Sequence, residues 1–256
     1  MVVINEIKRD VVRRALQEGK RLDGRKIDEY RPIEIQKMPS DNADGSALCR
    51  IGKSQVLAGI KFDNATPYAD RPTEGVFSTG AELLPIASPL FEVGPPREEA
   101  IELARIVDRG IRSAEIIDVN SFFVEEGKVL ALYLDLYVLD HDGNLIDCAA
   151  MAGMSALLSA RMPKIENGKI VRGEFAGPLD IKHKVVTCTF AKYEEGTILD
   201  PRLDEERGMD ARLTIATMPG KVCATQKGGW GAFTRKQTFD LIETSLAKGN
   251  ELRALL

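Results

Sequence analysis

The chain has 256 residues, of which 44% are hydrophobic and 29% are charged, and this balance predicts one large globular domain or two small ones. Its formal net charge at pH 7 is −4. A protein that coats nucleic acid by itself is usually basic, so any contact with nucleic acid must be confined to a local patch or shared with a partner.

Residues that commonly bind metals are scarce or scattered in this sequence. His141 and His183 are the two histidines, which disfavours a His-based metal site and a Ser/His hydrolase. We expect neither a metal nor a cofactor. The cysteines lack C-x-x-C spacing, and we expect them to be buried apolar filler in a reducing compartment: Cys49, Cys148, Cys188 and Cys223. Because no apolar run reaches about 18 residues, we expect a cytoplasmic protein without membrane contact.

The first part of the chain is predicted to form a helix, a turn and several strands. A partial apolar stripe predicts a helix over residues 4–19, and it consists of Ile4, Ile7, Val11 and Leu16. A turn follows at Arg21–Arg25, with Asp-Gly at its centre and Tyr30-Arg31 close behind. Strands are expected at Ile33–Gln36, Ser46–Ile51, Val56–Phe62 and Gly75–Leu84.

A helix with two distinct faces is predicted from Glu98 to Arg112. At about 100° per residue, one face is apolar and includes Leu103, Val107 and Ile111. The opposite face carries a stripe of Arg105, Arg109 and Arg112. Two interpretations are open. The charges can belong to an ordinary amphipathic helix that matches its macrodipole, or the guanidinium groups can bind a phosphate backbone.

A strand, a tight turn and a helix are predicted next. Lys128–Leu139 is almost continuously apolar, which predicts a central strand covered on both faces. The turn Asp142-Gly143-Asn144 leads into a predicted helix over Leu145–Met162, where Ala, Gly and Ser allow close packing. Such junctions often bind anions, but acidic residues and no basic residue surround this one. We therefore expect an anion to be repelled.

The last third of the chain predicts a second group of strands followed by a helix. Glu166–Pro178 is interpreted as a surface excursion, and Asp200-Pro201 as the start of an acidic loop. Strands are expected at Val185–Phe190, Thr197–Leu199, Arg212–Ile215 and Val222–Gln226. A final helix is expected after the capping residue Thr234. Strands followed by helices, twice over, predict an α+β protein of two similar halves.

An ordered set of motifs across nearly the whole chain resembles the RNase PH family of phosphorolytic exoribonucleases. The motifs are Arg21–Arg25 with Tyr30-Arg31, Ala43–Ala47, Glu102 with Arg105 and Arg109, Asp142-Gly143, and Asp200 with Glu206. The resemblance implies an RNase PH-like fold. Its first half would have the β-α-β-α arrangement of domain 2 of ribosomal protein S5, and a smaller α+β half would follow. The implied divisions are an N-terminal helix and turn at 1–29, a first half at 30–165 and a C-terminal half at 180–256.

Within this family the chain is most similar to the non-catalytic ring subunit of the archaeal exosome. The likeness is carried by Glu82–Pro85, Phe91–Pro96 and Asp200–Ala211. Active members place arginines where Glu98 and Glu99 stand here, a phosphate-binding arginine where Ile146 stands, and a catalytic aspartate where Glu206 stands. These departures imply that the chain has no catalytic residues of its own, because carboxylates repel phosphate.

The resemblance also implies the partners of the chain. A catalytic RNase PH-like subunit would alternate with it, three of each, in a hexameric ring that degrades and tails RNA at its 3′ end. RNA-binding cap proteins would be further partners. The resemblance does not imply binding to DNA. Arg105 and Arg109, with Arg112 as a third candidate, would contact single-stranded RNA, whereas the Arg21–Arg25 turn would be structural.

Two other functions remain open at this stage. The chain can be an active phosphorolytic 3′–5′ exoribonuclease on its own, which Glu206 and Asp200 would support. It can also be a free-standing RNA-binding module, which its net charge of −4 and the absence of a clustered aromatic platform disfavour.

Overall fold

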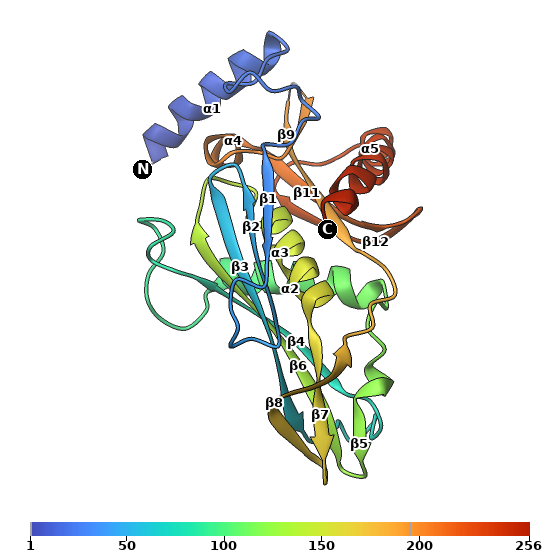
Figure 1. Ribbon diagram of the computed structural model, residues 1–256. Coiled ribbons are helices and arrows are strands. Elements are labelled where there is room, and N and C mark those ends of the chain that lie inside the picture. Colours follow the sequence, from blue (N-terminus) through green and yellow to red (C-terminus); the bar gives the residue numbers. More distant parts are fainter. Residues whose placement is uncertain (1, 195) are drawn as a thin grey trace.

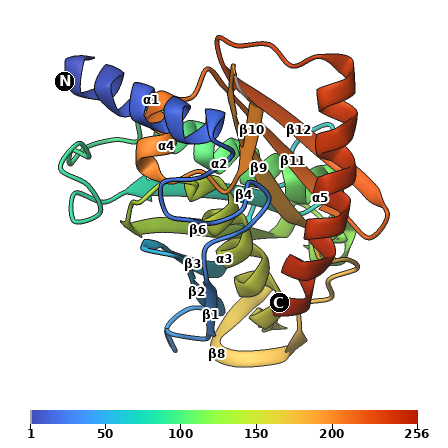
Figure 2. The ribbon, with the colours of Figure 1, turned by 90° about the horizontal axis from the view of Figure 1, so that it is seen from above.

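The described residues form two large β-sheets with two helices between them, and a separate two-stranded hairpin. A computed structural model describes residues 2–194 and 196–256, and the side chains of residues 2–9 lie outside the description. Figures 1 and 2 show the first sheet, the two inner helices, the second sheet and an outer C-terminal helix as successive layers. This arrangement confirms the α+β class and the RNase PH-like fold that the resemblance implies.

The first sheet contains six strands, and two of these strands form a β-α-β-α unit with the two inner helices. Its strands, in spatial order, are β1 (Ile33–Lys37), β2 (Gly45–Ile51), β3 (Ser54–Ala65), β6 (Lys128–Asp140) and β4 (Val76–Leu83), and β5 (Phe123–Glu125) also pairs with β6. Neighbours are antiparallel except β4 and β6, which are parallel. The chain connects this parallel pair through α2 (Glu98–Ser113) and η1 (Val119–Phe122), and α3 (Leu145–Ser159) follows β6.

Helix α3 packs against both sheets because small residues allow a close approach. Most of the helix is buried. A Cβ atom added at Gly153 would lie 3.2 Å from a methyl carbon of Leu134, and one added at Gly45 of β2 would lie 2.6 Å from the Cα atom of Ala160. The predicted close packing is thus confirmed. The helix ends at Ser159 instead of Met162 because Arg161 begins the next strand.

The second sheet is entirely antiparallel and is covered on both faces. Its strands, in spatial order, are β10 (Gly196–Leu199), β9 (Val186–Tyr193), β11 (Ala211–Met218) and β12 (Lys221–Gly229). Thr187 and Thr189 of β9 contact α3, whereas the Cys188 sulfur faces the Ser245 carbonyl of α5 (Arg235–Leu255). As predicted, Thr234 caps α5, because its side-chain oxygen accepts a hydrogen bond from the backbone N–H of Gln237.

The prediction that both faces of β6 are covered is wrong. One face, which includes Leu132, Leu134 and Leu136, is fully buried against the inner helices. On the other face Tyr133 is 39% exposed and Tyr137 is half-buried. Tyrosines occupy positions on the exposed face, so almost every residue of the strand is apolar or aromatic. The alternation between a buried and an exposed face therefore could not be recognised from the sequence.

A hairpin of two strands and one short helix were missed in the second half of the chain. The segment interpreted as a surface excursion, Glu166–Pro178, belongs to an antiparallel hairpin of β7 (Arg161–Glu166) and β8 (Lys169–Pro178). Ile170 and Val171 are adjacent, and glycines and charged residues interrupt the apolar positions of β8, so no regular alternation marked the strands. The acidic loop after Asp200 contains a short helix, α4 (Leu203–Gly208), which is too short to show helical periodicity.

The N-terminal helix, α1 (Val2–Gln17), uses a different apolar stripe from the predicted one. Val11 is 47% exposed, whereas its neighbour Val12 is 2% exposed and packs in a cluster with Leu16 and Tyr193. Val12 and Leu16 are four residues apart and therefore share a face. The predicted contributions of Ile4 and Ile7 fall on side chains outside the described residues.

The cysteines are free, and three of the four are buried as predicted: Cys49, Cys148 and Cys188. Burial raises the pKa of the Cys188 thiol to about 12, which keeps it protonated and unreactive at neutral pH. Cys223 is only half-buried. In the described part of the chain, no helix has the length and apolar character needed to cross a membrane.

A buried ionic cluster around Asp200 joins the N-terminal turn to the second half of the chain. The Asp200 carboxylate is fully buried and accepts hydrogen bonds from the Arg31 guanidinium at 2.7 and 2.9 Å and from the Arg25 guanidinium at 2.8 Å. It also accepts one at 2.7 Å from the Asn144 side chain, at the start of α3. These bonds to the charged form lower the pKa of Asp200 despite its burial.

The remaining arginine of the turn is buried in the same cluster. Arg21 pairs with Glu205 of α4 at 2.7 and 3.0 Å, and neither side chain is more than 3% exposed. Arg21 also donates to the backbone oxygens of Leu199 and Asp200. The expected structural role of the Arg21–Arg25 turn is therefore confirmed, because its arginines bind the protein itself.

We expect Asp200→Asn to lower the free energy of unfolding by about 3–5 kcal/mol, because it leaves buried guanidinium groups without their carboxylate. Asp200 has a positive φ of 50°, which asparagine tolerates, so backbone strain would not contribute. Urea denaturation at pH 7 measures the difference.

The matched control is Asp63→Asn, which removes an exposed carboxylate 3.4 Å from Arg172 and should cost less than about 1 kcal/mol. Because the folded-state pKa of Asp200 is lowered, the stability it provides is present above its unfolded pKa of about 4 and is lost as the pH falls further. Equal losses for the two variants would contradict a structural role for the cluster.

Candidate functional site

The arginine stripe of α2 lines one open groove. Arg105, Arg109 and Arg112 face a cavity of about 480 Å³ together with Ser78 and Thr79 of β4. The apolar face of the same helix, including Leu103, Val107 and Ile111, is buried in the core. The structure therefore brings the three predicted arginines together and directs them away from the core.

The three guanidinium groups differ in how strongly the protein restrains them. Among the described residues, Arg105 has no hydrogen-bonding or ion-pair partner. Arg109 donates one hydrogen bond, of 3.0 Å, to the Gln226 side chain of β12. Arg112 is fixed by Asp108 at 2.7 Å, by the Phe77 carbonyl and by stacking on the Phe77 ring. Arg105 is thus the cation most available to a ligand in this groove.

A smaller cavity on the adjoining side of α2 collects most of the positions that depart from the active family pattern. Its volume is about 240 Å³. Glu99, Ile146 and Glu206 line it, from α2, α3 and α4 respectively. Glu98, which was predicted alongside them, instead lines a separate and more apolar groove with Val93 and Ile101. We call the smaller cavity the carboxylate pocket.

A carboxyl group of the chain itself occupies the helix start beside the carboxylate pocket. The backbone N–H of Asn144, directly before α3, donates a 2.7 Å hydrogen bond to the Glu206 carboxylate. A free N–H at the start of a helix is a common ligand for phosphate. Here that N–H is engaged by a side chain of the same protein.

The charges in the carboxylate pocket disfavour an anion. Glu99 and Glu102 contribute further carboxylates, and the Arg212 guanidinium that also lines the pocket is paired with Glu102 at 2.7 Å. Ile146 is 6% exposed and offers no hydrogen bond to a ligand. Repulsion between like charges in a partly desolvated cavity would therefore weaken phosphate binding.

Burial shifts the proton affinities of two groups in the pocket. It raises the pKa of Glu206 from 4.5 to about 7, and the hydrogen bond from Asn144 only partly offsets this effect. Burial also lowers the pKa of His141, which stacks on the ring of Phe91. Near neutral pH Glu206 is thus divided between its charged and neutral forms.

Asp200 is excluded from the pocket, and this separates the two acids that the sequence placed together. The Asp200 carboxylate is 0% exposed and fully engaged in the ionic cluster, whereas Glu206 faces the pocket. Asn144 connects them, since its side chain binds Asp200 while its backbone N–H binds Glu206. Among the described residues no cluster of His, Cys, Asp and Glu is arranged to hold a metal ion.

Sequence reasoning missed several residues that shape these cavities. Arg212 enters the carboxylate pocket from a strand that carried no motif, and Phe91 enters it from a segment that was noted for the resemblance but not as part of a site. The junction before α3 was described as lacking a basic residue, yet Arg31 donates to the Asp142 carbonyl at 2.7 Å and to the Gly143 carbonyl at 3.1 Å. Arg31 is separated from this junction by more than 100 positions, so no local pattern could reveal the contact.

Comparisons with known proteins identify similar sequences and structures. Residues 29–163 match domain 1 of the 3′ exoribonuclease family, and residues 183–248 match domain 2. The chain is 45% identical to exosome complex component Rrp42 of Thermococcus gammatolerans. The alignment spans 256 residues and covers 98% of this chain and 94% of that protein.

Two solved structures share the whole fold. A chain of the Archaeoglobus fulgidus exosome with RNA bound to the active site superposes with a TM-score of 0.90 at 37% identity, covering 98% of each chain. A chain of an archaeal exosome core superposes with a TM-score of 0.87 at 35% identity, covering 98% of this chain and 96% of the other.

We expect Glu206→Gln to remove part of the pH dependence of stability. The folded-state pKa of Glu206 is raised, so the stability contributed by its neutral form is complete below pH 4.5 and is lost as the pH rises through about 7. The variant should therefore lose less stability than the wild type between pH 5 and 8. Urea denaturation across this range measures both profiles.

His141, with its lowered pKa, contributes in the opposite direction but is present in both proteins, so the difference between them isolates Glu206. Glu243→Gln, on the exposed face of α5, controls for the loss of one negative charge. Identical pH profiles for wild type and Glu206→Gln would refute the interpretation.

Proposed function

Because the chain belongs to the RNase PH-type 3′ exoribonuclease family, we propose that it is a non-catalytic ring subunit of an archaeal exosome. Relatives more than 40% identical over nearly the full length are exosome components, and two chains that share the fold come from archaeal exosomes. In this role the chain structures the active site of a catalytic partner and helps to bind RNA.

The absence of catalysis in this chain is supported above all by one contact. The N–H at the start of α3 binds the carboxylate of Glu206, and so is not free to bind inorganic phosphate. Phosphorolysis uses phosphate as the nucleophile and cannot proceed without a site for it. Ile146 and Glu99 in the same pocket provide no replacement for the missing cations.

The ability to contact RNA is supported by the groove that Arg105, Arg109 and Arg112 line. Guanidinium groups along one helix face can bind successive phosphates of a single strand without reading its sequence. A chain with a net charge of −4 would use such a patch together with a partner. This arrangement favours a subunit that guides RNA toward a neighbouring active site over a free-standing RNA-binding module.

The proposed assembly is a hexameric ring with three copies of this chain and three of a catalytic RNase PH-like subunit, in the cytoplasm, with RNA-binding cap proteins. Within this chain we propose an N-terminal helix and turn at 1–29 and two halves at 30–165 and 180–256. The family matches at residues 29–163 and 183–248 support this division.

The alternative, an active exoribonuclease that needs no partner, loses one of its two supporting residues. Asp200 is fully buried and bound by Arg25, Arg31 and Asn144, so it cannot reach a substrate. Glu206 alone keeps a carboxylate in the pocket, and its contact with Asn144 already gives it a structural role.

A phosphorolysis assay tests the proposal directly. This chain, its catalytic partner and the purified mixture are each incubated with phosphate and an RNA ending in 3′ poly(A), and the release of nucleoside diphosphate is measured. We expect activity only in the mixture. Arg105→Glu combined with Arg109→Glu should lower kcat/KM in the mixture at least about tenfold, because two phosphate contacts become repulsive.

The control combines Arg50→Glu with Arg172→Glu, which reverses two partly exposed arginines on β2 and β8 and should leave kcat/KM within about twofold of wild type. Phosphate-dependent activity from this chain alone would overturn the non-catalytic assignment. Unchanged activity of the Arg105 and Arg109 variant in the mixture would overturn the role of the groove.

A further inference from the structure

A second cavity opens beside the arginine groove, at the C-terminal end of α2. Its volume is about 390 Å³, within the range of about 300–1,000 Å³ that is usual for small-molecule sites. The loop before β4, β4 itself, the segment from Glu115 to Asn120 and Lys182 enclose it. Arg112 lines both this cavity and the groove, so the two adjoin at this side chain.

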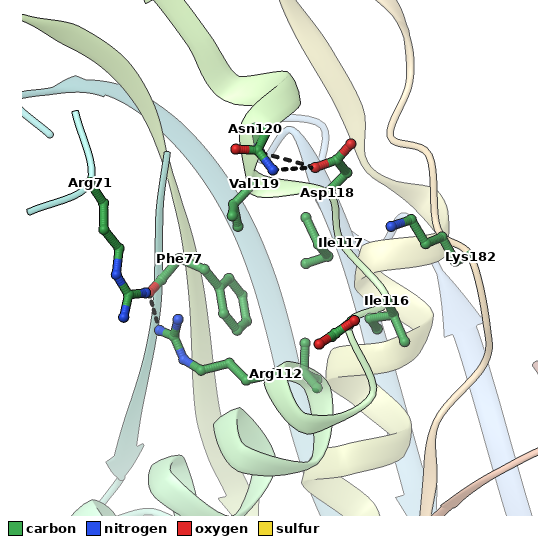
Figure 3. A pocket seen from close by; sticks show the side chains of 11 residues that line it. Arg71, Phe77, Arg112, Ile116, Ile117, Asp118, Val119, Asn120 and Lys182 are labelled. Carbon is green, nitrogen blue, oxygen red and sulfur yellow. Dashed lines mark hydrogen bonds between the residues drawn. The ribbon is translucent and has the colours of Figure 1, made fainter. Parts of the chain in front are cut away.

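Two guanidinium groups converge at one end of the cavity. Figure 3 shows Arg71, from the loop, and Arg112, from α2, pointing toward one another. Arg112 is fixed in place by the Phe77 carbonyl and by Asp108. Arg71 is 62% exposed, and among the described side chains it contacts Glu74 at 3.4 Å and Asp70 at 3.8 Å. Two converging cations repel each other, and an anion between them would relieve this repulsion.

The middle of the cavity is apolar. The side chains of Ile116, Ile117 and Val119 form a wall beside the Phe77 ring, as Figure 3 shows. Ile116 and Phe77 are buried, so the wall is part of the packed core and does not need to form on binding. A flat aromatic base or the face of a ribose would fit against such a surface.

The far end of the cavity carries polar groups of both signs. The Asn120 side chain donates a 3.2 Å hydrogen bond to Asp118, and an asparagine amide has further capacity to bind a base edge. The backbone of Lys182 is fixed beside the cavity because its N–H donates to the Ile116 carbonyl at 3.0 Å. The carboxylates of Glu115 and Asp118 oppose an anion here, so a phosphate is favoured only between Arg71 and Arg112.

We propose that this cavity binds one nucleotide, with its phosphate between Arg71 and Arg112 and its base or ribose against Ile117 and Val119. The order of cations, apolar wall and hydrogen-bonding rim matches the order of phosphate, sugar and base. The inference rests on the proposed function for the source of the nucleotide, which is an RNA strand that continues from the Arg105 groove. A free nucleoside diphosphate has the same chemistry, and the experiment separates the two sources.

The test uses the assembled ring with a matched pair of variants, Arg71→Glu and Arg172→Glu. Both arginines are about equally exposed, at 62% and 59%, and both lie 3.4 Å from a carboxylate, but Arg172 is on β8. Fluorescence anisotropy measures the affinity for a single-stranded RNA long enough to pass both cavities. We expect Arg71→Glu to weaken binding about five- to tenfold and Arg172→Glu less than twofold, as charge-assisted contacts to phosphate require.

Crosslinking locates the contact. RNAs that carry a single 4-thiouridine at successive positions are irradiated on the ring, and the crosslinked peptide is identified by mass spectrometry. One or two adjacent positions should crosslink to the segment 116–120, and Arg71→Glu should abolish this crosslink. Isothermal titration with adenosine diphosphate forms the second arm, in which binding sensitive to Arg71→Glu would assign the cavity to a free nucleotide.

The outcomes separate this inference from the proposed function. Loss of RNA binding in the Arg105 and Arg109 variant, together with normal RNA binding and crosslinking in Arg71→Glu and binding of adenosine diphosphate that Arg71→Glu does not change, would overturn the nucleotide cavity alone. Equal effects of Arg71→Glu and Arg172→Glu would also overturn it, because they would reflect net charge and not a site.

Discussion

The buried carboxylate of Asp200 is the constraint on which the rest of the structure depends. It accepts hydrogen bonds from Arg25 and Arg31 in the N-terminal turn and from Asn144 at the start of α3. Three segments that are far apart in the sequence are therefore fixed relative to one another by a single side chain. Because a buried charge without partners is so costly, these segments must take their native positions together. Asn144 then presents its backbone N–H to Glu206, and so the geometry of the carboxylate pocket follows from the same cluster.

This dependence explains how a fold shared with phosphorolytic enzymes can suit a supporting role. The strand–turn–helix junction that often binds an anion is intact, but a side chain of α4 already occupies its N–H group. On the other side of α2, the arginine groove stays open and carries cations that the protein leaves partly unrestrained. One helix thus separates a pocket whose carboxylates disfavour phosphate from a groove that is lined by arginines. In the role that we propose, the chain would not bind the phosphate nucleophile but would offer a cationic surface to RNA.

Local patterns in the sequence predicted the elements that bury an apolar face, and little of what joins them. The four-residue spacing of Leu103 and Val107 correctly predicted the inner face of α2. The small residues after Asn144 correctly indicated a tightly packed helix. The hairpin of β7 and β8 was missed because glycines and charged residues interrupt its apolar positions and its pairing contains register shifts. Arg21, Arg25 and Arg31 were noticed as a pattern, but Glu205 and Asp200, which bind them, lie 169 to 184 positions away, so this chemistry depended on the tertiary fold. The separation of Asp200 from Glu206 could not be predicted either, because Asp200 precedes α4 and is buried in the ionic cluster, whereas Glu206 lies within α4 and faces the carboxylate pocket.

The ionic cluster also has a consequence for the folding of the chain during translation. Arg31 is synthesised 169 residues before Asp200, which is about 10 to 30 s at ordinary rates of translation. Until Asp200 has been synthesised, Arg31 lacks the fully buried carboxylate that it binds in the folded protein, whereas Arg25 already has its local partner Asp23. The native contacts of the N-terminal turn are therefore completed only after Asp200 has left the exit tunnel.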